Sequence, residues 1–81
     1  MKLQLGELEK GRKARIVAVG DQKTESAEIC ARLMEMGLLE NSVVEVIHEA
    51  PFGGDPIAVR VRGALIALRR LEANQIWVEY E

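Results

Sequence analysis

Residues 24–38, TESAEICARLMEMGL, decide how this chain is interpreted, because they form the one convincing helix among short strands. At about 100° per residue, its apolar side chains cover about half of the helix circumference, whereas a surface helix usually needs a stripe of roughly 100°. These side chains are Ala27, Ile29, Cys30, Leu33, Met34 and Met36. The extra width predicts that one flank of the helix binds another molecule.

Both ends of this helix carry recognisable signals. Thr24 is the best N-cap candidate, because its hydroxyl can accept a hydrogen bond from a free amide of the first turn. Gly37 suits the left-handed position that follows a helix, and Leu38 is then expected to fold back onto Leu33 in a Schellman ending. We therefore predict a helix over about residues 25–36.

The rest of the chain contains short apolar segments separated by turn residues. A single turn is expected over residues 5–8 and one turn of helix over residues 70–74. Strands are predicted at 13–19, 42–49, 56–62, 64–69 and 76–80. Five short strands at this spacing indicate a mostly β fold, either a small barrel or a partly open sandwich, with one inserted helix.

Length and composition limit the classes of function. The 81 residues predict a single domain over 1–81, and the 48% hydrophobic content argues against disorder. The net charge of −2 gives no reason to expect nucleic-acid binding. No run approaches the ~20 apolar residues needed to cross a bilayer, and the N-terminal segment is too polar for a signal peptide. One cysteine allows no internal disulfide, which fits a reducing compartment.

Catalytic and metal-binding patterns are weak. His48 is the single histidine, and no second nitrogen or sulfur ligand stands at a useful spacing. Cys30 has no neighbouring base and is expected to behave as a small apolar residue. Gly53 and Gly54 form the tip of a hairpin loop, because a phosphate loop needs a lysine and a following helix. We expect no enzyme activity, no catalytic or metal site and no cofactor.

Residues 56–71 hold four arginines and no acid, which is the one local bias in charge. Arg60 and Arg62 share the outward face of a predicted strand. They can pair with Glu45 and Glu49 across a hairpin, which is the simpler interpretation. Alternatively, they form a basic patch that steers the domain onto an acidic partner surface.

Two apolar features also have two interpretations. Met34 either fills a gap in the core or offers an adaptable contact surface. Trp77 lies with Glu79 rather than with Ile76 and Val78, so it is either a lid over a barrel edge or an interface anchor. The predicted partner-binding residues are Cys30, Met34, Leu39, Trp77, Arg60 and Arg62.

Several stretches, in their order and spacing, resemble the FeoA family of small bacterial proteins of ferrous iron transport. They are residues 8–11, 14–16, 32–38, 43–46, 50–57 and 68–73. The chain departs from the family at Glu40-Asn41, where Pro-Gly is frequent, and at Gly53-Gly54, where one glycine is common. The resemblance implies an SH3-like β-barrel with a helix inserted after the first strand. Similar domains also end some metal-dependent repressors.

The resemblance also implies a partner: the FeoB-type membrane permease of ferrous iron, which has a cytosolic GTPase domain. We expect a non-enzymatic accessory protein, cytoplasmic or recruited to the inner face of the membrane without inserting into it. A direct carrier of ferrous or another transition metal ion and a small nucleic-acid-binding barrel are the alternatives. Exposed apolar patches permit self-association, so a homo-oligomer is left open.

Overall fold

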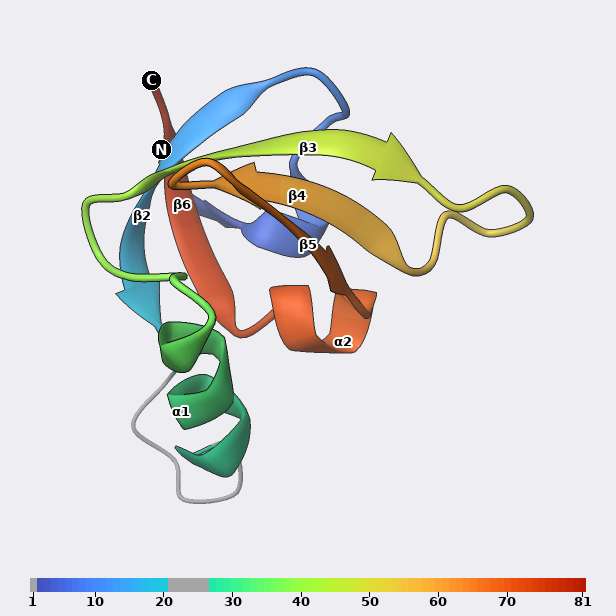
Figure 1. Ribbon diagram of the computed structural model, residues 1–81. Helices are drawn as coiled ribbons and strands as arrows, with labels where there is room; N and C mark the ends of the chain where they lie inside the picture. The colour runs from blue at the N-terminus through green and yellow to red at the C-terminus, as the bar shows by residue number, and fades with distance from the viewer. Residues whose placement is uncertain (1, 21–26) are drawn as a thin grey trace.

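The computed structural model describes residues 2–20 and 27–81, which form a curled antiparallel sheet with one main helix (Figure 1). In chain order the elements are β1 (Lys2–Gln4), the 3₁₀ turn η1 (Leu5–Glu7), β2 (Lys13–Val19), α1 (Ala27–Glu35), β3 (Val43–Glu49), β4 (Ile57–Val61), β5 (Ala64–Leu68), α2 (Arg70–Ala73) and β6 (Ile76–Tyr80). The strand order in the sheet is β1-β6-β2-β3-β4-β5. The predicted mostly β fold with an inserted helix is confirmed.

The strand count differs from the expectation of five. The described residues form six strands, because Lys2–Gln4 pairs with β6 through Leu3 opposite Val78 and Gln4 opposite Trp77. Three residues are too few to show an alternating pattern, so this strand has no signal of its own in the sequence. It exists because β6 offers it a partner.

Alternation of buried and outward side chains builds the barrel core. In β4 the inward residues Ile57, Val59 and Val61 are buried, as the sequence predicts. In β6, Ile76 and Val78 are buried in the same way. The remaining core side chains are also aliphatic: Leu5, Leu8, Ala14, Ile16, Leu33, Leu38, Val44, Val46, Leu68 and Ala73. The interior therefore rests on aliphatic packing rather than on aromatic residues.

The end of α1 is the best-predicted local structure. The Leu38 amide donates to the Leu33 carbonyl at 3.1 Å, and the Gly37 amide donates to the Met34 carbonyl at 3.0 Å. Gly37 has φ = 102°, the left-handed backbone that glycine adopts without strain. These two bonds define the predicted Schellman ending, with Leu33 and Leu38 both buried. The predicted N-cap, Thr24, lies outside the described residues.

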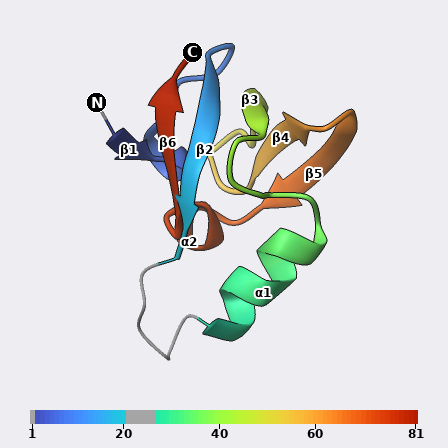
Figure 2. The same ribbon diagram turned by 90° about the vertical axis from the view of Figure 1, so that its left-hand side faces the viewer.

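A tight turn then returns the chain to the sheet. Asn41 has φ = 73°, and its amide donates to the Ile16 carbonyl at 2.7 Å. Asn is one of the few side chains that tolerate this backbone, so Asn41 can serve where a Pro-Gly turn is frequent in the family. Figures 1 and 2 show the result: α1 lies at the end of the barrel where β2 finishes and β6 begins.

Candidate functional site

The C-terminal end of α1 carries exposed apolar side chains. Met34 is 42% exposed and Leu39 is 37% exposed, so neither fills the core. Met36 is also exposed, although its helical position predicts that it shares the buried stripe of Leu33. The helix ends at Glu35, so the periodicity no longer fixes the direction of Met36. Sequence reasoning therefore missed Met36 as a surface residue.

Cys30 corrects an expectation, because it is buried rather than exposed on the helix flank. The residue is only 6% exposed. It packs against Gly20 at the end of β2, so closely that a Cβ atom on Gly20 would lie 2.3 Å from the Cys30 Sγ atom. A contact between residues in different elements covers this side of the helix, and helical periodicity cannot foresee it. Cys30 is thus not accessible to a partner.

Arg62 approaches the exposed end of the helix from the β4–β5 turn. Its Cδ atom is 3.9 Å from the position that a Cβ atom on Gly37 would occupy. The Gly37 amide donates to Met34, and the Gly37 carbonyl accepts from the Leu39 amide at 3.0 Å. Gly37 is therefore bonded through its main chain to Met34 and Leu39 and lies close to Arg62. We call Met34, Met36, Leu39 and Arg62 the helix-end patch.

Arg60 and Arg62 behave differently from each other, although the sequence places them on one face. Arg60 lies opposite Glu45 in the β3–β4 register, with 3.8 Å between Nη1 and Oε1, so that predicted pair is confirmed. Arg62 does not pair with Glu49. Arg62 lies in the turn between β4 and β5, with φ = 52°. Glu49 lies at the other end of β4, where it is opposite Ile57 in the β3–β4 register.

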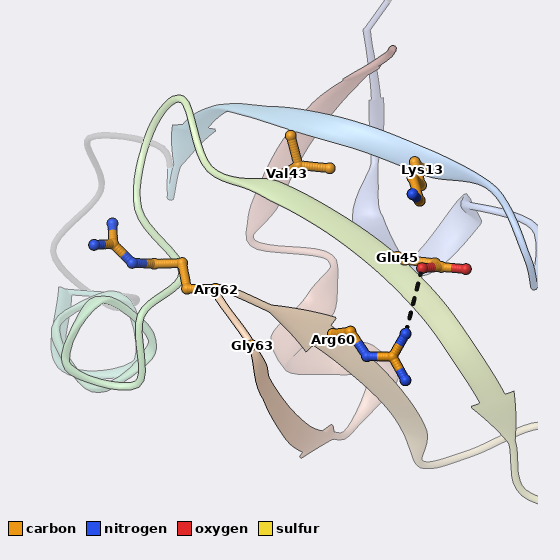
Figure 3. Close-up of a pocket in the computed structure, with 6 residues that line it drawn as sticks. All are labelled: Lys13, Val43, Glu45, Arg60, Arg62 and Gly63. Carbon is orange, nitrogen blue, oxygen red and sulfur yellow. Dashed lines mark ion pairs between the residues drawn. The ribbon is translucent and has the colours of Figure 1, made fainter.

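These two arginines line a shallow hollow on the outer face of the sheet. The hollow has a volume of about 210 Å³, and its walls are Lys13, Val43, Glu45, Arg60, Arg62 and Gly63. Figure 3 shows Arg60 reaching across to Glu45 while Arg62 points away from them, toward the helix. Of the three cationic residues in its walls, Arg60 is paired with Glu45 and the Arg62 guanidinium is turned toward the helix, so Lys13 is the cation left to attract an acidic group of a partner at the hollow itself.

Arg70 takes the carboxylate that was expected to pair with Arg62. Its Nη2 atom lies 2.8 Å from Glu49 Oε1, and its Nε atom donates to the Gly54 carbonyl at 2.8 Å. Its Nη1 atom also donates to the Gly6 carbonyl. One guanidinium thus fastens η1, the end of β3 and the 50–56 loop together. A run of arginines in the sequence does not distinguish this structural arginine from its neighbours.

Trp77 is half-buried on the outer side of β6. It alternates with the buried Ile76 and Val78, and it lies opposite Gln4 of β1 and Ala18 of β2. Its intermediate burial on this face fits either predicted role, a lid over the barrel edge or an interface anchor. Its direction agrees with the alternation of the sequence, while its predicted role in partner binding stays a prediction.

The described residues were compared with the arrangements that hold metal ions. Within residues 2–20 and 27–81, no group of three or more His, Cys, Asp or Glu side chains is arranged to hold a metal ion. His48 is exposed on β3, whereas Cys30 is buried against Gly20, so these two candidate ligands have different surroundings. No helix in this part of the chain is long and apolar enough to span a bilayer.

Comparison with known proteins adds a family relationship. The model of the FeoA domain matches residues 3–80. A FeoA-like protein from Clostridium acetobutylicum has a similar structure, with a TM-score of 0.85 and 30% identity over 98% of this chain and 86% of that chain. FeoA from Stenotrophomonas maltophilia aligns with a TM-score of 0.82 and 32% identity over 95% of this chain and 89% of that chain. A search of curated proteins found no match.

The Stenotrophomonas protein is a prokaryotic SH3 domain protein in complex with zinc, and its suggested role is that of a bacterial ferrous iron transport activating factor. A manganese-dependent transcriptional repressor also matches, with a TM-score of 0.83 and 20% identity over 99% of this chain and 42% of that chain. At this identity the likeness shows the fold alone. The SH3-like barrel implied by the sequence is confirmed.

Proposed function

Because the chain belongs to the FeoA family, we propose that it is a non-enzymatic, cytoplasmic accessory protein of bacterial ferrous iron uptake. It docks on the cytosolic side of a FeoB-type GTPase permease and modulates transport. Docking would also bring it to the inner face of the membrane without insertion. The suggested role of the Stenotrophomonas relative as a transport activating factor supports this direction.

The helix-end patch is the observation that carries the proposal. Met34, Met36 and Leu39 leave 37–42% of their surfaces exposed around a single glycine. Methionine adapts its shape to a partner surface, and because these side chains are already more than half buried, covering the rest of one contributes about 1 kcal/mol, less than half of the value for full burial. Arg62 stands beside these side chains, where a cation can improve the rate and orientation of encounter with an acidic surface.

We expect the remaining predicted contact residues to contribute less to docking than the helix-end patch. Arg60 is held near Glu45, so we expect it to influence long-range attraction more than close contact. Trp77 is already half-buried, so it has less surface to bury against a partner than an open tryptophan has. Cys30 is withdrawn from the docking surface, because Gly20 covers its sulfur. The proposed docking surface is therefore smaller than the predicted set of six residues and consists of the C-terminal end of α1 and the adjacent β4–β5 turn.

Met34→Glu tests this site. We expect at least about a tenfold loss of affinity for the purified cytosolic GTPase domain of a FeoB-type permease, measured by calorimetry, because the charge would be desolvated in the interface. Leu71→Glu is the matched control, since Leu71 is 77% exposed on α2 and is not a member of the helix-end patch. Unchanged affinity in a folded Met34→Glu variant would show that the patch is not the docking site.

Ferrous iron uptake in cells that carry the permease gives the functional readout. Met34→Glu should shift uptake toward the level seen without the accessory protein, whereas Leu71→Glu should not. An anaerobic titration with ferrous iron addresses the metal-carrier alternative. Saturable, stoichiometric binding that is lost on changing His48 or Cys30 would favour a carrier over a docking module.

A further inference from the structure

The sheet has an unpaired edge at β5. Within the described strands, β5 pairs with β4 alone and stands last in the order β1-β6-β2-β3-β4-β5. Figures 1 and 2 show β5 beside β4 with no strand on its other side. An edge strand presents main-chain donors and acceptors that can pair with another extended segment.

The β4–β5 hairpin defines which groups are open. Its loop has two residues, Arg62 and Gly63, with φ values of 52° and 82°, as in a type I′ turn. In such a hairpin the closing pair, Val61 and Ala64, exchanges both hydrogen bonds, and this pairing recurs at every second residue.

The residues between these bonded positions therefore direct their main-chain groups outward. They are Leu65 and Ala67, which lie opposite Arg60 and Ala58 in the register. Neither makes any other backbone hydrogen bond to the described residues. The open edge thus offers the N–H and C=O groups of Leu65 and Ala67 at the two-residue spacing of a strand partner.

The usual protection of an edge strand is missing from β5. Its five residues, ALIAL, include no charge and no proline, and Leu65 is 64% exposed. The opposite edge, β1, has three residues and begins with a lysine. Short length and an edge lysine are common ways to block unwanted pairing, so β1 is guarded and β5 is not.

Charge selects the occupant of this edge. Arg62 precedes β5 by two residues and Arg69 follows it directly, and neither forms an ion pair with a described residue. A second copy paired through the same strand would bring arginines close to arginines in either direction, which is unfavourable. A segment with acidic ends would instead meet both cations.

We propose that β5 accepts an extended, acidic-ended segment of another protein as an added strand. The main chain of the segment pairs with Leu65 and Ala67, an apolar side chain covers Leu65, and acids near its ends meet Arg62 and Arg69. Strand addition of this kind gains affinity from main-chain bonds and selectivity from alternate side chains. The inference concerns the β5 edge, which shares Arg62 but no apolar residue with the helix-end patch, and it does not depend on the permease.

A synthetic peptide tests the proposal on the full-length protein. The probe is acetyl-EVTVTVE-amide, which alternates like a strand and carries an acid at each end. In ¹⁵N NMR titrations we expect the largest amide shifts within residues 63–69 and slower hydrogen exchange at Leu65 and Ala67. The matched peptide acetyl-KVTVTVK-amide should bind at least about tenfold more weakly, and the difference should shrink with salt.

Two changes isolate the main-chain pairing. N-methylation of alternate peptide amides should abolish binding, because it removes the donors on one edge of the probe. Ala67→Pro removes an outward N–H without touching the bonds to β4, and it should also abolish binding. Ala67→Val keeps the N–H and should retain binding. Leu65→Glu places a charge of the same sign as the peptide's acidic ends at an exposed edge position and removes the apolar contact, so it should weaken binding without disturbing the core.

Four outcomes would overturn the proposal. They are equal binding of the acidic and basic peptides, unchanged binding by Ala67→Pro or by the N-methylated probe, shifts centred on Met34 rather than β5, and no binding at millimolar peptide. Self-association of the free protein through β5 would identify a second copy as the occupant and would equally exclude an acidic partner segment.

Discussion

Two residues on the same flank of α1, Cys30 and Met34, look alike in sequence and differ in the folded protein. Cys30 and Met34 are one helical turn apart, and both extend the apolar stripe beyond Leu33. Cys30 is pressed against Gly20 and is buried, whereas Met34 stays open to solvent. An amphipathic pattern can therefore predict that a helix has a wide apolar face, but the neighbouring elements decide which part of it is covered.

The largest effect on the free energy of unfolding should come from Leu33, the buried residue beside Cys30 and Met34. Leu33→Ala removes a side chain that is 1% exposed, whereas the Leu33 carbonyl that accepts from the Leu38 amide is kept. We expect a loss of about 2–5 kcal/mol in the free energy of unfolding, measured by urea denaturation, since the site leaves a cavity in the core. A loss below about 1 kcal/mol would mean that α1 is not anchored on the barrel.

Gly20→Ala tests the contact that covers Cys30. The added Cβ would lie 2.3 Å from the Cys30 Sγ atom, and Gly20 has φ = 78°. Overpacking and left-handed strain together predict a loss of about 2–3 kcal/mol in unfolding free energy. Gly11→Ala is the matched control, because Gly11 has φ = 87° but nothing within 4 Å of an added Cβ. It should lose only the strain contribution, about 1 kcal/mol.

The double variant Gly20→Ala/Cys30→Ala separates the two contributions at this position. Removing the sulfur relieves the clash and leaves the backbone strain, so the losses of the single variants should not add. We expect a coupling free energy of at least about 0.5–1 kcal/mol in the double-mutant cycle. Strict additivity would mean that Cys30 and Gly20 are not in contact.

The smallest effect on stability is expected at Met34, the exposed residue of the pair. Met34→Ala removes a side chain that is already 42% exposed, so we expect a change of about 0.5 kcal/mol or less in unfolding free energy. The same denaturation experiment as for Leu33→Ala checks it. A loss comparable with that of Leu33→Ala would place Met34 in the core and remove it from the docking surface.

Much of the fold is predictable because its signals are local. Alternation assigns Ile57, Val59 and Val61 to the core, and Gly37 marks the end of the helix. The strand β1 is not predictable in this way, since three residues carry no period. The candidate site is less predictable than the fold. Its exposed members Met34 and Leu39 come from the sequence, but the burial of Cys30 and the exposure of Met36 do not.

Ion pairs, too, divide into those that local sequence predicts and those that only the folded structure shows. Arg60 and Glu45 are paired by hairpin register, which adjacent strands reveal. Glu49 pairs instead with Arg70, which is 21 residues away and reaches it from α2. A guanidinium can satisfy several groups at once, so its partners depend on which loops the folded chain brings within reach.

Local chemistry alone thus accounts for short aliphatic strands, a helix that stops at a glycine and a turn at Gly63, although not for Arg62 leaving the strand to join that turn. Packing between distant segments accounts for the rest: Gly20 over Cys30, Arg70 on Glu49, and a β5 edge left without a neighbour among the described strands. The physical reason is the distance along the chain over which each interaction acts. Backbone preference and side-chain period act over a few residues, whereas burial and strand pairing depend on what lies nearby in space.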